Sequence, residues 1–247
     1  LRLCLLITIV SLAGLYSPSY TVAEDSTQET SNGFHNESEL GIVITTGNSQ
    51  SNTINLKQKN TYDWGKNELS VKGSFLRTST SGVESARSWA IGMRYDRYLD
   101  DDWTLFLAQG MESNIFSGYV QKYITDLGAK YYFINKENVY WLAEGGYRYV
   151  FENLTSDADT SFHFVRIYSE VKRKWNKSFS TKYWIELLPN LTSLSDYEVN
   201  TEISLQAVLT KVFSLKTGYL LKFDNIPSSD VSYRLDTYFT NSLVAEF

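Results

Sequence analysis

The sequence contains very little cysteine, proline or histidine. Of its 247 residues, one is cysteine, three are proline and two are histidine. The cysteine, Cys4, lies inside the first apolar run, so we expect the processed chain to hold no thiol, which excludes disulfides and thiolate chemistry. His35 and His163 are far apart in sequence, and no cluster of residues has metal-ligand spacing. We therefore expect no metal site and no cofactor.

Basic residues are not in excess, and helical periodicity is missing. The formal net charge is −5, so the chain lacks the basic footprint of a nucleic-acid-binding protein, and we expect no nucleic-acid partner. Segments with a period of 3.6 residues do not extend beyond a turn or two, whereas period-two alternation is widespread. Aromatic residues reach 15%, with tyrosine the leading contributor. Together these features indicate an all-β chain.

The first residues have the composition of an export signal. Arg2 precedes the apolar run at residues 3–15, and small residues around Ala23 suit cleavage before Glu24. The run is too short to span a bilayer, so we predict a secretory signal peptide over residues 1–23. Residues 24–37 are polar and acidic without periodicity, and we expect a disordered periplasmic lead-in there. One barrel domain over residues 38–247 would follow.

Long alternating segments fill the rest of the chain. In residues 123–133, Tyr123, Leu127 and Tyr131 fall on one face, with Asp126 and Lys130 on the other. Such alternation predicts strands with one apolar and one polar face. We predict twelve strands, at about 38–46, 50–64, 67–78, 86–98, 103–114, 120–134, 138–152, 161–174, 178–190, 197–210, 212–225 and 231–247.

The lengths of the connections indicate how these strands are arranged. Short connections are expected at 65–66, 99–102, 135–137, 176–178 and near Lys211, and longer ones at 80–86, 115–119, 153–160, 191–197 and 226–230. Bacterial outer-membrane barrels have short periplasmic turns and longer outer loops. We therefore predict a transmembrane antiparallel up-and-down β-barrel with both termini on the periplasmic side. In hydrocarbon every backbone amide must be paired, which a closed barrel achieves. A soluble up-and-down barrel remains the alternative.

Aromatic residues near the predicted short turns support a membrane location. Trp64, Trp103, Trp141 and Trp175 each lie within a few residues of such a turn, where one aromatic girdle of a membrane barrel is expected. Trp184 alone is predicted in mid-strand with an inward side chain. The final strand ends on Phe247, a C-terminal aromatic of the kind expected as the signal for the barrel-assembly machinery. We expect the protein in the bacterial outer membrane, surrounded by its lipids.

Two segments carry a resemblance to a known family. Residues 39–64, "ELGIVITTGNSQSNTINLKQKNTYDW", and residues 94–114, "RYDRYLDDDWTLFLAQGMESN", resemble hairpins of the YdiY-like proteins. That family is described as putative salt-induced outer-membrane proteins and as a domain of unknown function. The resemblance extends over almost all of residues 38–247 and implies an outer-membrane β-barrel. It brings no catalytic residues.

Catalytic alternatives have little support in the sequence. An outer-membrane phospholipase sets histidine two residues before serine on one outward face, but His163 is followed at that spacing by Val165. Ser161 shares a face with His163, yet a histidine at the membrane interface explains the residue better. A calcium site formed by Glu152, Asp157 and Asp159 is less probable than a solvated acidic loop. We therefore predict no catalytic residues and a non-enzymatic protein.

Charged residues on the inward parity are the strongest functional lead. Fourteen of them are expected to line the lumen: Lys57, Arg94, Glu112, Asp126, Lys130, Glu144, Arg148, Arg166, Glu170, Lys182, Glu186, Glu202, Lys222 and Arg234. Further inward charges include Asp96, Lys122, Lys216, Asp224 and Asp236. Nearly balanced signs suit either a narrow mixed-charge channel for small solutes or ions, or a closed barrel whose ion pairs satisfy one another. The closed form would be a structural or salt- and envelope-stress-related protein.

Overall fold

The computed structural model describes residues 33–45, 50–155, 158–227 and 233–246, and within them twelve strands follow one another along the chain. One turn of 3-10 helix, Ile115–Ser117, separates β5 from β6. The strands are β1 (Gly33–Thr45), β2 (Ser51–Trp64), β3 (Asn67–Thr80), β4 (Val83–Tyr98), β5 (Trp103–Asn114), β6 (Tyr119–Lys136), β7 (Val139–Leu154), β8 (Thr160–Asn176), β9 (Phe179–Pro189), β10 (Tyr197–Val208), β11 (Phe213–Asp224) and β12 (Leu235–Glu246).

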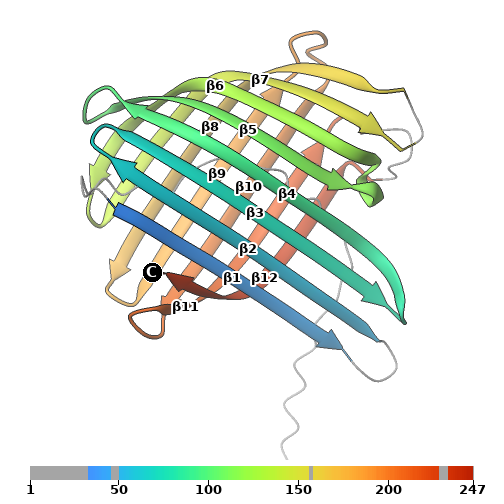
Figure 1. Ribbon diagram of the computed structural model, residues 1–247, viewed down its shortest axis with the longest axis horizontal. Coiled ribbons are helices and arrows are strands. Elements are labelled where there is room, and N and C mark those ends of the chain that lie inside the picture. The colour runs from blue at the N-terminus through green and yellow to red at the C-terminus, as the bar shows by residue number, and fades with distance from the viewer. Residues whose placement is uncertain (1–32, 46–49, 156–157, 228–232, 247) are drawn as a thin grey trace, which may run out of the picture.

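Each strand pairs with its sequence neighbours, and β12 pairs with β1 to close the barrel. All the pairings are antiparallel, and Figure 1 shows the tilted strands around one central space. Glu37 of β1 lies opposite Glu246 of β12, so the start of the first strand and the end of the last lie at the same end of the barrel. The predicted up-and-down barrel is therefore confirmed.

Several predicted boundaries need correction. Strand β1 begins at Gly33, so residues 33–37, assigned above to the lead-in, pair with β2 instead. The long loop predicted at 80–86 is wrong, because β3 and β4 are joined by a tight turn at Ser81 and Gly82. Both residues have positive φ, of 52° and 80°, as hairpin turns of this length require. The predicted signal peptide, residues 24–32 of the predicted lead-in and Phe247 lie outside the described residues.

Side chains alternate between an exposed apolar face and a buried face. In β5, Leu105 and Leu107 are 47% and 52% exposed on the outer surface, while Phe106 and Ala108, which alternate with them, are buried. Leu127 of β6 and Leu205 of β10 are likewise exposed. An outer surface of this composition suits hydrocarbon rather than water. The inward-facing position of Trp184, which is 6% exposed, is confirmed.

The interior is less polar than the sequence suggested. One buried cluster contains Ala90, Ala108, Ile124, Val150, Phe164 and Leu188. A second contains Tyr132, Tyr140, Leu142, Tyr168 and Trp184. Strand β7 contributes to both, and its inward charges Glu144 and Arg148 lie between Leu142 of one cluster and Val150 of the other. The barrel therefore has a layered core in which charged residues separate two apolar clusters.

No helix among the described residues is long and apolar enough to cross a membrane.

Candidate functional site: a charge network inside the barrel

Three strands bring Arg94, Glu144 and Arg166 together in the interior. Arg94 Nη2 of β4 lies 2.9 Å from Glu144 Oε1 of β7, and Arg166 Nη1 of β8 lies 2.5 Å from Glu144 Oε2. All three side chains are at most 1% exposed. A guanidinium forms directed, charge-assisted hydrogen bonds to a carboxylate, and Glu144 receives them from both arginines. Glu144 is thus the centre of a three-residue bridge.

A second part of the same network involves Arg148 of β7. Its guanidinium donates to Asp126 at 2.7 and 2.8 Å, in a bidentate pair across the β6–β7 ladder. Arg148 also donates to Glu186 of β9 at 3.2 Å, and Arg166 donates to Glu186 at 2.7 Å. Arg166 therefore joins the two parts, because Glu144 and Glu186 both accept hydrogen bonds from it.

Lys130 and Asp96 complete a set of balanced charge. Arg94 donates to both Asp96 oxygens, and Lys130 Nζ lies 3.3 Å from Asp96 Oδ1. We call these eight residues the charge network: Arg94, Asp96, Asp126, Lys130, Glu144, Arg148, Arg166 and Glu186. Four are basic and four are acidic, which is the balance needed to offset the desolvation of buried ions.

Glycines in β6 and β7 make room for an aromatic ring beside the network. A Cβ on Gly128 would lie 2.5 Å from the Gly145 carbonyl oxygen and 2.7 Å from Phe106 Cζ. The Phe106 ring therefore packs directly onto the backbone of β6. The Arg94 guanidinium lies over this ring at 4.2 Å from its centroid, a cation–π contact.

The other predicted charged residues are dispersed around the interior. Glu170 accepts hydrogen bonds from the hydroxyls of Tyr140 and Tyr168 and pairs with Lys182 at 3.4 Å. Glu112 accepts from Tyr119 at 2.9 Å. Four predicted residues remain. Lys57 pairs with Glu39, and Arg234 is exposed just before β12. Glu202 in β10 has intermediate exposure, and Lys222 in β11 is 9% exposed. These seven residues do not belong to the charge network.

Part of the wall away from the network is lined by small polar residues. Asn55 of β2, Ser70 of β3 and Ser214 of β11 are at most 6% exposed and have inward parity. Gly41 of β1 and Gly218 of β11 are also buried. Among the described residues, Asn55 Nδ2 and Ser70 Oγ are buried without a protein hydrogen-bond partner. Buried polar atoms need a partner, and water is the one that such a wall admits.

Sequence reasoning missed Glu39, which is 4% exposed. Its carboxylate lies 3.3 Å from Lys57 Nζ of β2 and 3.2 Å from Lys216 Nζ of β11. A signal was present, because Leu40 and Ile42 point outward and so place Glu39 on the inward parity. The inward aromatics Phe106, Tyr132 and Tyr168 were also missed.

The tryptophans near the short turns take part in aromatic contacts on the outer surface. Trp103 contacts Tyr131 at 4.8 Å between ring centroids, and Trp141 stacks on Phe133 at 4.6 Å. Trp64 stacks on Tyr62 at 5.5 Å, and Trp175 lies against the Arg173 guanidinium. All four lie near the connections at 65–66, 99–102, 137–138 and 177–178. Their position suits an aromatic girdle at one membrane interface.

The residues weighed for catalysis and for calcium have other contacts. His163 Nδ1 lies 2.5 Å from the Tyr147 hydroxyl oxygen on the outer surface, and its ring also contacts Tyr149. Glu152 pairs with Lys122 at 2.6 Å inside the barrel. No group of acidic, histidine or cysteine side chains within the described ranges could hold a metal ion, and Asp157 lies outside those ranges.

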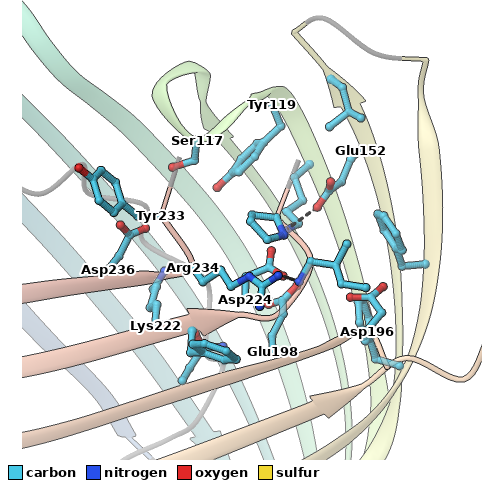
Figure 2. Close-up of a pocket in the computed structure, with 18 residues that line it drawn as sticks. Ser117, Tyr119, Glu152, Asp196, Glu198, Lys222, Asp224, Tyr233, Arg234 and Asp236 are labelled. Atoms are coloured by element: carbon cyan, nitrogen blue, oxygen red, sulfur yellow. Dashed lines mark hydrogen bonds and ion pairs between the residues drawn. The ribbon is translucent and has the colours of Figure 1, made fainter. Parts of the chain in front are cut away.

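A pocket of about 220 Å³ lies at the end of the barrel opposite the short turns. Its lining includes Lys122, Glu152, Glu198, Asn200 and Asp224, with Arg234 just before β12 and Asp236 at its start (Figure 2). Asn200 donates to Glu186 of the charge network at 3.3 Å. We call this cavity the mouth pocket; it is joined to the network through Asn200.

The chain is similar to several solved structures at low sequence identity. The chain is similar to the translocator domain of the autotransporter NalP from Neisseria meningitidis, with 10% identity, 90% of each chain covered and a TM-score of 0.50. It is also similar to the NanC porin (14% identity, 87% and 98% covered, TM-score 0.48) and to the KdgM porin (10%, 87% and 99%, 0.47). No curated protein sequence matches the chain.

The fold and the outer surface define the class of protein. A closed antiparallel barrel with an apolar exterior is the architecture of bacterial outer-membrane proteins, and this chain is such a barrel. A family model matches residues 38–247, nearly the whole of the described barrel. The chain therefore belongs to DUF481, a family of proteins of unknown function.

Proposed function

We propose that the barrel is a narrow, non-enzymatic channel for small solutes or ions. The observation that carries this proposal is the asymmetry of the interior. The charge network projects from β4 and β6–β9. On β1–β3 and β11, small polar inward residues such as Asn55, Ser70 and Ser214 alternate with separate charged residues such as Glu39, Lys57 and Lys216. We infer that the smaller of these side chains leave space beside the network, in which their buried hydroxyl and amide groups would favour water.

The charges predict the kind of solute that would pass. The charge network contains four residues of each sign, so its field is short-ranged and does not exclude one sign of ion outright. The number of strands lies between that of the filled eight-stranded barrels and that of the wide sixteen-stranded porins. We therefore expect small conductance with weak selectivity between cations and anions.

Conductance in a planar lipid bilayer tests the proposal. Purified barrels should produce discrete steps, and Ser70→Trp should reduce their size because Ser70 is buried on the inward face of β3. The matched control is Val71→Trp, at the next residue, whose side chain is 38% exposed on the outer face. Silent membranes despite verified insertion, or equal effects of the two substitutions, would overturn the channel.

The alternative is a closed envelope barrel of the kind implied by the resemblance to the salt-induced proteins. One observation favours it: Arg94, Arg166 and Glu186 are at most 1% exposed, so ion pairs occupy the interior where the network lies. A closed barrel predicts a silent wild type, together with conductance when a network charge is removed, as in Glu144→Gln. Conduction by the wild type would reject this alternative.

A further inference from the structure

The seam between β1 and β12 is the shortest strand pairing in the described barrel. Its register runs only from Glu37 opposite Glu246 to Leu40 opposite Leu243. On its other edge, β1 pairs with β2 along its whole length, from Gly33 to Thr45. The partner strand β12 likewise pairs with β11 from Leu235 to Ala245. Both strands are therefore well formed, but they are joined over only four residues.

An ionic contact and a glycine hold this short seam together. Glu39, in the paired part of β1, contacts Lys216 of β11 at 3.2 Å and so connects the two sides of β12. Its second partner, Lys57 of β2, lies at 3.3 Å. A Cβ on Gly41 would lie 3.2 Å from the Asn241 carbonyl oxygen, so the strands are in close contact where the pairing ends. The seam is thus closed at one end, next to the short turns.

Past Leu40 the registered pairing stops, although both strands continue. The side chains here are apolar and exposed: Ile42 is 55%, Ile44 is 68% and Phe239 is 67% exposed. Val43, which has inward parity, is 47% exposed. Apolar side chains therefore flank the unregistered part of the seam on the outer face, and Val43 of the same segment lies on the inward face.

Backbone groups along this part of the seam require a partner. An unpaired peptide group costs several kcal/mol in hydrocarbon, so a permanently open edge facing lipid is unfavourable. Continuing the observed register would set Ile42 opposite Asn241 and Ile44 opposite Phe239. Two arrangements are thus compatible with the strands: a zipped seam, and an open seam whose edges are hydrated from the lumen.

We propose that the seam between Gly41–Thr45 and β12 is a lateral portal that admits the acyl chain of a single-chain amphiphile. The exposed apolar side chains along the seam suit contact with the acyl chain. The headgroup would be held by the mouth pocket, which carries both signs of charge and includes Arg234 and Asp236 at the start of β12. A small zwitterionic headgroup matches this lining. The portal does not depend on ion conduction, since lateral entry requires no open passage through the charge network.

Cysteine cross-linking tests the portal, because the described strands contain no cysteine. In folded barrels in lipid vesicles, the Leu40→Cys/Leu243→Cys pair should form a disulfide, since these residues are registered partners. The Ile44→Cys/Phe239→Cys pair should remain reduced and react with a flexible bis-maleimide. Equal disulfide formation by both pairs would overturn the portal. It would also be overturned if the first pair formed no disulfide in a folded barrel, with folding shown by a change in electrophoretic mobility on heating.

A photoreactive lipid probe tests whether a single-chain amphiphile occupies the portal. The probe is a single-chain phosphocholine with a diazirine in its acyl chain, and labelled peptides are mapped in the Ile44→Cys/Phe239→Cys protein. Label is expected on the segments around Val43 and Tyr238, and it should be lost once the bis-maleimide has bridged the seam. Unchanged label after bridging would overturn lateral entry. A conductance measurement on the same samples separates this result from the channel proposal, since bridging should leave the conductance steps in place.

Discussion

At the scale of single residues, the absence of a methyl group at Gly128 determines how the interior packs. Phe106 and the backbone of β7 occupy the space that a side chain would need. Gly128→Ala should lower the free energy of unfolding by about 1–3 kcal/mol, the usual cost of overpacking. Denaturant unfolding in detergent micelles, followed by tryptophan fluorescence, measures this loss.

Gly145 provides the matched control one strand away. A Cβ there would meet nothing within 4 Å, so Gly145→Ala should leave stability unchanged or raise it slightly. If both substitutions lowered stability equally, the close packing of Phe106 on Gly128 would be wrong.

A second prediction at the scale of single residues concerns Glu144, which accepts hydrogen bonds from two arginines. Glu144→Gln removes the shared anion and leaves an excess of positive charge in a buried site, so it should cost about 3–5 kcal/mol of stability. Glu84→Gln is the comparison, since Glu84 also contacts two arginines, Arg77 at 2.9 Å and Arg87 at 3.5 Å, but at the start of β4 beside the turn, where its side chain is 26% exposed. There the loss should be at most about 1 kcal/mol. Similar losses for the two variants would show that the network is solvated rather than buried.

At the scale of the strand, the outer face of β5 should lie against lipid. Leu107 is 52% exposed in mid-strand, and Leu99 is 48% exposed in the connection before the strand. Leu107→Arg should destabilise the folded barrel by about 2–4 kcal/mol, the cost of arginine near the bilayer midplane, and Leu99→Arg by about 1 kcal/mol or less. Urea titration of the barrel in lipid vesicles measures both. An equal effect at the two sites would contradict a membrane-embedded β5.

Strands were the part of the fold that period-two alternation predicted best. The predicted bounds of β5 are those observed, and β6 and β7 differ by two residues or fewer at each end. The error at 80–86 arose because Ser81 and Gly82 form a turn, and the polar residues around them are strand residues exposed to water. Polarity alone does not distinguish a loop from a strand that extends beyond the membrane.

The site was harder to predict than the strands. Parity indicated that Arg94 and Glu144 share the interior, but their contact joins β4 to β7 across two intervening strands. Such a contact depends on the tilt and stagger of the closed barrel, which no single hairpin encodes. Parity also failed to identify the inward aromatics, because Phe106 and Tyr168 resemble lipid-facing residues in composition. A consistent alternation is therefore compatible with a core that is part ionic and part apolar.

At the scale of the whole molecule, the barrel is asymmetric around its axis. The charge network and both apolar clusters are built from β4 to β9, whereas β1 and β12 meet over four residues and rely on Glu39 for a further connection. The buried contacts between strands are therefore most extensive on the side of the barrel opposite the seam. Local opening of a folded protein begins where few buried contacts cross, so the seam is where we expect the barrel to open first.

The central claim is the orientation of the strands: apolar faces toward lipid and charged faces toward the lumen. Spin labels placed one at a time at Ile203, Ser204, Leu205 and Gln206 in β10 test it most directly, because successive side chains in a strand point to opposite faces. Relaxation by lipid-soluble oxygen should be strong at Ile203 and Leu205, which are 52% and 41% exposed, and weak at Ser204 and Gln206. Strong oxygen relaxation at Ser204 and Gln206 instead, or no alternation along the four sites, would contradict the account.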